Sequence, residues 1–473
     1  MRGVAVGGSF RDPSSFVFLR DGVPLRQVNE QGRDAYVRLM RSGCYTALVG
    51  AGLLIPHEEI GRGAALMPES AYTVLRPTPV PMVSYPYEWS VGQLHDAALA
   101  TLDIQRRALA FGLSLVDASA YNIQFVGGRP VLIDTLSLVP YHPGAPWGAY
   151  RQFCEHFLAP LALMSARDAR FGQLIRSTID GIPLDFTSAL LPWRTKLRPG
   201  IALHLVAHAW SQRRHESRPL REDAGRGFSR RAFLGLLQGL EETIRHCAWE
   251  PSGTTWAAYY DGDSYSASAF AEKQRIVGQY LDTVHPTTVW DFGANTGAFS
   301  ALAAQRGAHV TAFDNDVGAV ELHYRSVRER GERRVLPLFM DLANPSPALG
   351  WAHEERLSLQ ARGPVDCLLA LALLHHLAIG RNVPLERIAA LFASLASMVI
   401  LEFIPKEDQK VRQLLASRAD IFPTYTYEGV LHAFAPHFSL VQSQVIPGSL
   451  RTLLLLRTLR RVARSCRVGC RGQ

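Results

Sequence analysis

The stretch from Val289 to Ser300, VWDFGANTGAFS, joins an acidic residue and two glycines where an apolar run gives way to a turn. Gly293 and Gly297 allow the backbone to turn tightly and approach a ligand, and a helix after such a turn offers N–H groups that no carbonyl accepts. A second apolar run ends in Asp314, 17 residues after Gly297. A carboxylate at that place suits the hydroxyls of a ribose, so the two elements predict a site for a nucleotide-like cofactor.

The elements that must position these residues recur at regular intervals along the C-terminal half. Apolar runs typical of strands alternate with helical patterns, and the expected strands are residues 289–292, 309–313, 335–339, 366–372, 398–403, 438–445 and 451–456. This alternation predicts an α/β fold with a doubly wound, mainly parallel, seven-stranded sheet. Residues 446–450 are too few for a crossover helix, so the last two strands should form an antiparallel hairpin at the sheet edge.

The closing hairpin and the motif from Asp291 to Gly297 resemble the Rossmann-like class I S-adenosylmethionine-dependent methyltransferases, over roughly residues 255–457. The resemblance implies S-adenosyl-L-methionine as cofactor, held at its methionine end by Asp291, Gly293, Asn295 and Gly297, at its ribose by Asp314 and at its adenine by Asp341. Asn295 replaces a commoner glycine, which asparagine tolerates because it adopts left-handed backbone angles readily. The alternative is a strand-to-helix turn with capping carboxylates.

Candidates for the reaction itself follow the fourth and fifth expected strands. The resemblance places His375 and His376 near the methyl group, where an imidazole could accept a proton. Alternatively, one histidine hydrogen-bonds the backbone and the other lines the pocket without chemistry. Glu402 could face the methyl acceptor, or it could cap a helix or form a salt bridge. Methyl transfer needs in-line positioning first, and a base only if the acceptor holds its proton, so the need for a base stays open.

Three residues upstream of the first expected strand are further candidates for cofactor binding. Tyr260 and Tyr265 could stack on adenine or shield a sulfonium, and Lys273 could pair with a carboxylate. Simple packing is the alternative for the two aromatic residues.

The N-terminal half resembles a protein-kinase-like domain, which implies an α+β fold. Asp117 and Asn122 have the spacing of the catalytic base and the metal-binding asparagine, and Asp134 ends an apolar strand as the metal-binding aspartate does. Residues 84–88 resemble the hinge between kinase lobes, and an Asp21-Gly22 turn predicts an early hairpin. The alternative for Asp117 and Asn122 is a tight turn in which their side chains bind their own backbone.

Three departures from the kinase pattern argue against phosphotransfer. No lysine precedes Lys196, no glycine-rich phosphate loop is visible, and Asp134 is followed by Thr-Leu. Phosphate clamping would lack its usual cation, for which Arg26 is the obvious substitute on the early hairpin. Asn122 and Asp134 would therefore bind a metal only if the domain were active, and no other metal site is expected. A non-catalytic role, binding the acceptor or a partner, is the prediction.

Length and composition set the expected domain organisation. The 473 residues, 47% of them hydrophobic, suffice for several domains with ample cores. We expect a kinase-like domain at 1–212, a polar linker at 213–229, a methyltransferase domain at 230–457 and an arginine-rich tail at 458–473. The helical pattern at 229–245 is expected to pack onto the methyltransferase.

Bulk features also bound the location and the partners. The start of the chain lacks a signal-like apolar block and no apolar run has the length of a bilayer span, so a cytoplasmic protein is expected. Six cysteines without a CxxC pair predict reduced thiols. The net charge of +8 arises from arginines clustered at 213–231 and 457–471, which we interpret as solvated linker and tail, so nucleic acid is an open but disfavoured partner.

These patterns together predict an S-adenosylmethionine-dependent methyltransferase whose acceptor is unidentified, with a small molecule or carbohydrate favoured. The whole chain also resembles bacterial two-part methyltransferases, some of which are labelled nodulation proteins. Two alternatives remain: a binding protein whose nucleotide pockets are remnants, and a methyltransferase fused to an active phosphotransferase. The acceptor atom and the oligomeric state stay open.

Overall fold

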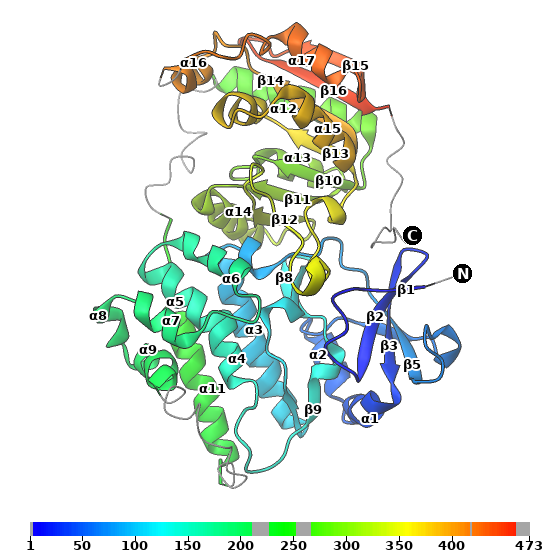
Figure 1. Ribbon diagram of the computed structural model, residues 1–473, viewed down its shortest axis with the longest axis vertical. Helices are drawn as coiled ribbons and strands as arrows, with labels where there is room; N and C mark the ends of the chain where they lie inside the picture. The colour runs from blue at the N-terminus through cyan, green and yellow to red at the C-terminus, as the bar shows by residue number, and fades with distance from the viewer. Residues whose placement is uncertain (1–2, 211–226, 252–265, 417–418, 460–473) are drawn as a thin grey trace. The chain divides into compact units, whose positions relative to one another are not determined.

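The computed structural model describes residues 3–210, 227–251, 266–416 and 419–459 (Figure 1). The chain forms two compact units: the first comprises Met1–Glu250 together with Gly350–Glu355, and the second comprises Pro251–Leu349 and Arg356–Gln473. Tyr260 and Tyr265, most of the predicted linker and nearly all of the predicted tail lie outside the described residues. Their predicted roles stay predictions.

The N-terminal unit begins with an antiparallel five-stranded sheet in the order β1-β2-β3-β5-β4. Its strands are β1 (Val4–Ala5), β2 (Ser15–Arg20), β3 (Val23–Asn29), β4 (His57–Glu59) and β5 (Ala71–Pro77), and the helices α1 (Arg33–Arg41) and α2 (Cys44–Gly50) lie between β3 and β4 in the chain. The turn between β2 and β3 has positive φ at Asp21 (52°) and Gly22 (79°). This confirms the hairpin that the Asp-Gly pair predicted.

A helical part with two small ladders completes this unit. The long helix α3 (Val91–Ala110) precedes the strands β6 (Leu113–Leu115), β7 (Ile123–Val126), β8 (Arg129–Leu132) and β9 (Leu138–Pro140), which pair as β6-β9 and β7-β8. Further helices of this unit are α4 (Tyr150–Phe153), α5 (Ala159–Ala166), α6 (Leu174–Ser177), α7 (Leu184–Leu190), α8 (Trp193–Lys196), α9 (Pro199–Ile201) and α11 (Arg230–Arg245), with π-helical turns η6 (Cys154–Leu158) and η8 (Ala202–Ala207). A strand-rich part followed by a helical part is the predicted α+β kinase-like arrangement.

The predicted hinge connects these two parts. The backbone N–H of Ser84 donates to Oε1 of Gln124 at 2.8 Å, and Nε2 of Gln124 donates to the carbonyl of Ser84 at 2.9 Å. Glu88 then accepts a hydrogen bond from the backbone of Tyr85 at 2.9 Å, at the start of the turn that leads into α3. The segment is therefore fixed to β7 by a buried amide rather than by a strand ladder.

Helix α11 corrects one prediction, because it belongs to the N-terminal unit and not to the methyltransferase domain. It packs along α3, and Arg106 of α3 forms an ion pair with Glu241 of α11. Its apolar stripe, Phe233, Leu237, Leu240 and Ile244, is buried. Periodicity shows that a helix has an apolar face but does not show which domain covers that face.

The C-terminal unit contains the predicted seven-stranded sheet, in the order β12-β11-β10-β13-β14-β16-β15. The strands are β10 (Thr288–Phe292), β11 (His309–Asp314), β12 (Val335–Phe339), β13 (Val365–Ala370), β14 (Ala396–Phe403), β15 (Phe438–Val445) and β16 (Thr452–Thr458). The first five pair in parallel, whereas β16 runs antiparallel to both β14 and β15. The predicted antiparallel hairpin at the sheet edge is thus confirmed. Its second strand, β16, lies between β14 and β15, and β15 forms the edge of the sheet.

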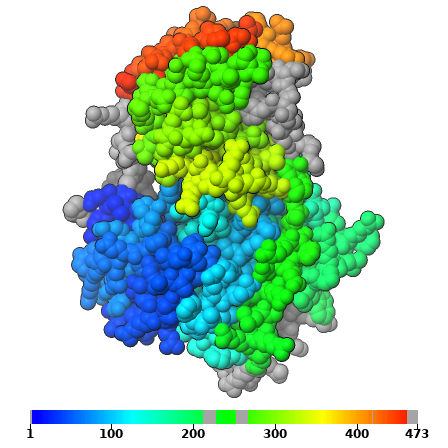
Figure 2. Space-filling model, turned by 180° about the vertical axis from the view of Figure 1, so that it is seen from behind, coloured from blue at the N-terminus to red at the C-terminus, as the bar shows by residue number. Residues whose placement is uncertain are grey.

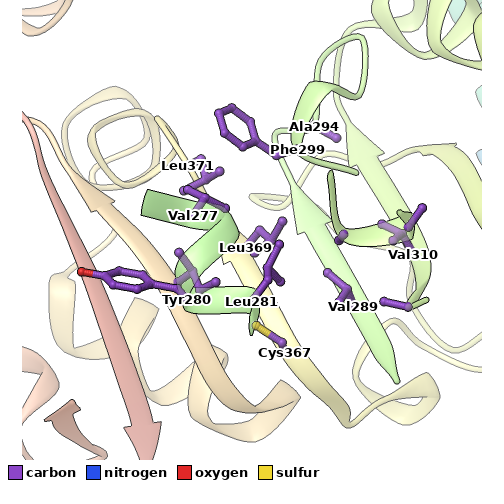
Figure 3. Packing of buried hydrophobic residues seen from close by; sticks show 14 of the residues in the cluster. Val277, Tyr280, Leu281, Val289, Ala294, Phe299, Val310, Cys367, Leu369 and Leu371 are labelled. Carbon is purple, nitrogen blue, oxygen red and sulfur yellow. The ribbon is translucent and has the colours of Figure 1, made fainter. Parts of the chain in front are cut away.

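Helices connect these strands, and α12 covers the core of the sheet (Figure 3). They are α12 (Ala267–Val284), α13 (Ala298–Ala304), α14 (Val317–Glu329), α15 (Leu385–Leu395), α16 (Gln409–Leu415) and α17 (Tyr427–Phe434), with the π-helical turn η12 (His376–Gly380) after β13. Figure 3 shows Val277 and Leu281 of α12 beside Leu369 of β13. This packing fixes α12, and with it Lys273, against the strands that carry the predicted site.

Candidate cofactor pocket

A pocket of about 280 Å³ opens beyond the carboxyl ends of β10, β11 and β13. Of the predicted residues, its lining includes Lys273, Asp291, Gly293, Asn295, Asp314, Asp341 and His376. Sequence reasoning missed the other lining residues, which are Ala294, Phe299, Asn315, Met340, Leu342, Leu371, Ala372, Leu373, Leu377, Gly380 and Arg381. Most of these are apolar or lie on η12, so no charge or glycine pattern marked them. Gly297, His375 and Glu402 are not part of this lining.

Two buried carboxylates stand at the ends of adjacent parallel strands. Asp291 of β10 accepts a hydrogen bond from the hydroxyl of Ser300 at 2.6 Å. Asp314 of β11 accepts from the backbone N–H groups of Asn295 at 2.8 Å and Asp316 at 2.9 Å. Burial raises the pKa of each to about 6, and these hydrogen bonds oppose the rise. Both groups are therefore mostly ionised at neutral pH, although they are buried.

The loop after β10 has the backbone that its residues predicted. Gly293 has φ 74° and Asn295 has φ 50°, so asparagine does adopt the left-handed conformation. The N–H groups of Gly293 and Ala294 both donate to the carbonyl of Phe313, at 2.9 and 3.0 Å. The loop is thereby fastened to β11, which brings its backbone beside Asp314.

Gly297 does not line the pocket, and the packing around it explains why this residue is a glycine. It precedes α13 with φ 88°, and a Cβ atom there would lie 2.0 Å from Nε2 of His323. His323 of α14 is buried, and burial lowers its pKa to about 3. The glycine therefore allows the neutral His323 ring to pack directly against the loop.

We expect Gly297→Ala to destabilise the C-terminal unit by about 2–5 kcal/mol, the sum of a left-handed alanine and an overpacked contact. The matched control is Gly307→Ala, where φ is 91° but no atom lies within 4 Å of the added Cβ. That variant should lose only about 1–2 kcal/mol. Thermal melting of both variants measures the difference, and equal melting temperatures would contradict the packing explanation.

Lys273 and Glu402 form a buried ion pair behind the pocket. The Lys273 ammonium lies 2.7 Å from Oε2 of Glu402, and the exposed fractions of the two side chains are 4% and 0%. Oε2 also accepts the backbone N–H of Ala372 at 2.8 Å. Burial lowers the pKa of Lys273, and Glu402 opposes that change. Of the three roles considered for Glu402, the salt bridge is the contact observed, and it joins α12 to β14.

Arg451 extends this pair into a network that sequence reasoning missed. Its guanidinium lies 3.7 Å from Glu402 and donates from Nε to Oδ2 of Asp408 at 2.8 Å, although the arginine is only 1% exposed. Arg451 immediately precedes β16, and Asp408 caps α16. An arginine at the start of the apolar run at 452–456 was the signal available in the sequence. The network holds β14, β16 and α12 in one arrangement.

The two predicted histidines separate in the structure. His376 lines the pocket, while His375 is 1% exposed and its ring contacts that of His376 at a tilt of 38°, with centroids 4.1 Å apart. Burial lowers the pKa of His376 to about 4 and that of His375 well below its usual value. Neither ring nitrogen of His375 has a hydrogen-bond partner within the described residues. The pocket thus presents one neutral imidazole.

Asp341 follows β12 and lines the pocket. Arg381, from the segment after η12, approaches it with Nη2 3.4 Å from Oδ2. The side chains are 54% and 31% exposed, so solvent screens this contact strongly. The predicted adenine-facing carboxylate therefore lines the pocket beside an exposed cation.

The kinase-like positions of the N-terminal unit have a different geometry. Asp117 accepts a hydrogen bond from the backbone of Ser119 at 3.0 Å, which is the local turn of the alternative reading. It also accepts from the side chain of Gln152 at 2.8 Å. Arg26 of β3 forms an ion pair with Asp134. A metal ion at Asp134 would lie beside the Arg26 guanidinium, and the two positive charges would repel each other. This arrangement argues against the phosphotransferase alternative.

Neither a metal cluster nor a spanning helix occurs in the part of the chain that the structure describes. No group of three or more His, Cys, Asp or Glu side chains is placed to hold a metal there. No helix in these ranges is long and apolar enough to cross a bilayer. Cys44, Cys154, Cys247 and Cys367 are buried and unpaired, and Cys466 and Cys470 lie outside the described residues.

The chain has low sequence identity and low structural similarity to the solved structures that it matches. The kinase-inhibitor complex of WbdD is 17% identical and matches 42% of this chain and 43% of its own, with a TM-score of 0.30. Magnesium protoporphyrin IX methyltransferase (ChlM) of Synechocystis PCC 6803 is 22% identical over 42% of this chain and 90% of its own, TM-score 0.30. The N-methyltransferase NodS of Bradyrhizobium japonicum WM9 is 10% identical over 41% and 98%, TM-score 0.30. The chain thus spans less than half of the WbdD structure.

Comparison with known sequences gives a full-length relative. No protein-family model matches the chain. The nodulation protein NoeA of Rhizobium meliloti (strain 1021) is 36% identical over 458 residues, which cover 95% of both proteins. Identity at this level across both units requires a shared architecture. The chain therefore belongs to the family of the nodulation protein NoeA.

Proposed function

We propose that the C-terminal unit is an S-adenosylmethionine-dependent methyltransferase. One observation carries the proposal: Lys273, Asp291, Gly293, Asn295, Asp314 and Asp341 come from four separate segments and line a single pocket at the carboxyl ends of the parallel strands. The strand order with its inserted antiparallel β16 supports the same conclusion. The alternative of a binding protein with remnant pockets would not need all of these groups together.

The residues fit this cofactor by charge and by donor type. S-adenosylmethionine supplies a methyl group carried on a positively charged sulfur. Asp314, fixed by two backbone N–H groups, keeps lone pairs to accept from two ribose hydroxyls. The Asp291 carboxylate can accept from the amino group of the methionine end. The Lys273 ammonium, which has three donors, can donate to the carboxylate of the same end while it pairs with Glu402. Asp341 can accept from the adenine amino group.

His376 is the candidate for contact with the methyl acceptor. With its pKa lowered to about 4 it is neutral at pH 7, so it adds no positive charge beside a sulfonium. It can accept a hydrogen bond from an acceptor hydroxyl and orient it, whereas such a low pKa makes it a weak general base. His375 and Glu402 would act through His376 and Lys273 as positioning residues.

We propose a small molecule or carbohydrate as the acceptor class. Lys273 and Arg381 are the cations of the described pocket lining, whose other residues are neutral or acidic. This composition does not suit a chain of phosphates. We also propose a cytoplasmic location, in keeping with the four buried unpaired cysteines.

The decisive test is calorimetric titration of the full chain with S-adenosylmethionine, S-adenosylhomocysteine and NAD⁺. We expect the first two to bind at micromolar concentrations and NAD⁺ to show no heat of binding. Binding of NAD⁺ alone would replace the proposal with a dinucleotide enzyme. If a folded chain binds none of the three, the remnant-pocket alternative is favoured. Binding without methyl transfer to any carbohydrate or small acceptor would limit the proposal to cofactor binding.

Cofactor affinity should depend on pH through the two buried aspartates. Their pKa values of about 6 lie above the ordinary 3.8, so the ligand-free unit loses stability as the pH rises from about 4 through 6. A cationic ligand requires the ionised form, so affinity should be constant above pH 7. It should fall by about tenfold per pH unit below pH 6, if one carboxylate must be ionised. Titrations between pH 5 and 8 measure this, and a flat profile would contradict it.

A further inference from the structure

Helix α8 of the N-terminal unit presents two large apolar side chains to solvent. Trp193 is 67% exposed and Leu197, the residue that ends the helix, is 69% exposed. Residues four apart lie on the same helix face, so the indole and the leucine are neighbours. Thr195, between them, is buried and anchors the opposite face. Single exposed apolar residues are ordinary, whereas a paired tryptophan and leucine form an apolar face that no described residue covers.

Basic side chains alternate with these apolar ones. Arg194, Lys196 and Arg198 stand beside Trp193 and Leu197, and between residues 183 and 210 the sequence has one acidic residue, Asp185. The Arg194 guanidinium lies 5.3 Å from the centroid of the Trp193 ring, so the charge and the indole form one surface. None of the three basic side chains has an ion pair within the described ranges. The face is therefore both apolar and positively charged.

The position of α8 leaves this face accessible. Figure 1 shows α8 at the outer edge of the N-terminal unit, away from its sheet, and Figure 2 shows the teal-green segment that contains it projecting from the side of the unit. Leu203, on η8 further along the same segment, is 61% exposed. Because the segment projects from the unit, α8 can contact a flat surface without hindrance from the rest of the unit.

We propose that the α8 face, defined as Trp193, Arg194, Lys196, Leu197 and Arg198, binds the surface of an anionic lipid bilayer. Tryptophan and leucine leave water at the level of the lipid headgroups, and arginine and lysine pair with lipid phosphates while their stems lie along apolar surface. A second copy of the chain suits the face poorly, since a two-fold contact would place like charges against each other. The contact is peripheral, and it is independent of the methyltransferase proposal.

The test is sedimentation of the full chain with vesicles of phosphatidylcholine alone and of phosphatidylcholine with 30% phosphatidylglycerol. We expect binding to the anionic vesicles to exceed binding to the neutral ones at least tenfold, and to fall as salt is raised. The variant Trp193→Ala/Leu197→Ser and the variant Arg194→Gln/Lys196→Gln/Arg198→Gln should each lower it at least tenfold. A blue shift of tryptophan fluorescence on binding should disappear in the first variant.

The control is Trp351→Ala/Ile421→Ser, which removes two residues that are 75% and 65% exposed elsewhere. It should bind vesicles like the natural chain, and unchanged circular dichroism and melting should establish that each variant folds. Equal binding by the natural chain and both α8 variants would overturn the proposal. So would a natural chain that ignores vesicles but forms a dimer that Trp193→Ala/Leu197→Ser dissociates, because the face would then belong to self-association.

Discussion

Replacing Asp314 with alanine is expected to weaken the binding of S-adenosylmethionine at least 100-fold. In the proposed site this carboxylate would accept from two ribose hydroxyls, and each hydrogen bond to a charged group contributes about 1.5–3 kcal/mol. The substitution also removes the acceptor for the backbone N–H groups of Asn295 and Asp316, which hold the loop beside β11. Calorimetric titration at pH 7.5 measures the loss.

The matched control for that experiment is Asp282→Ala. Asp282 is an aspartate outside the pocket that pairs with Arg306 on the surface, with Nε 2.7 Å from Oδ1. It should leave affinity unchanged, because an exposed pair contributes little even to stability. If a folded Asp314→Ala protein bound the cofactor within threefold of the natural chain, Asp314 would not be its ribose acceptor.

Glu402→Ala is expected to destabilise the C-terminal unit by about 3–5 kcal/mol. The carboxylate is fully buried between Lys273 and Arg451, and its removal leaves buried positive charge without its partner. For a unit of this size the melting temperature should fall by on the order of 10 °C. Calorimetric melting measures it, and the transition of the C-terminal unit is the one that S-adenosylmethionine raises.

Two further variants separate charge from packing at Glu402. Glu407→Ala removes an exposed glutamate five positions away and should leave the melting temperature nearly unchanged. Lys273→Met/Glu402→Leu removes both charges of the pair and should recover part of the loss, because an apolar pair of similar volume often replaces a buried ion pair. If Glu402→Ala melted like Glu407→Ala, the network would not stabilise the unit.

The sequence determined the sheet of the C-terminal unit and the acidic residues of the pocket. Strand alternation, the short 446–450 connection and the glycines of the loop are local features, and parallel strands bring their carboxyl ends to one edge whatever surrounds them. Asp291 and Asp314 lie at the carboxyl ends of strands that were recognised, and Asp341 follows another, so their meeting in one pocket was predictable. The left-handed backbone of Asn295 was predictable for the same local reason.

Tertiary structure alone decided the contacts that join distant segments. Lys273 and Glu402 are 129 positions apart in the sequence, and nothing local indicates that α12 brings one to the other or that Arg451 joins them. By periodicity alone, the apolar stripe of α11 could pack on either unit. Residues Gly350–Glu355 also belong to the N-terminal unit, in which Nη2 of Arg11 lies 2.7 Å from Oε1 of Glu355. Gly297 has the loop position that the motif predicted, but its closest constraint is the ring of His323. Local sequence determines which face is apolar and where a charge stands on an element, whereas the partner of each depends on long-range packing.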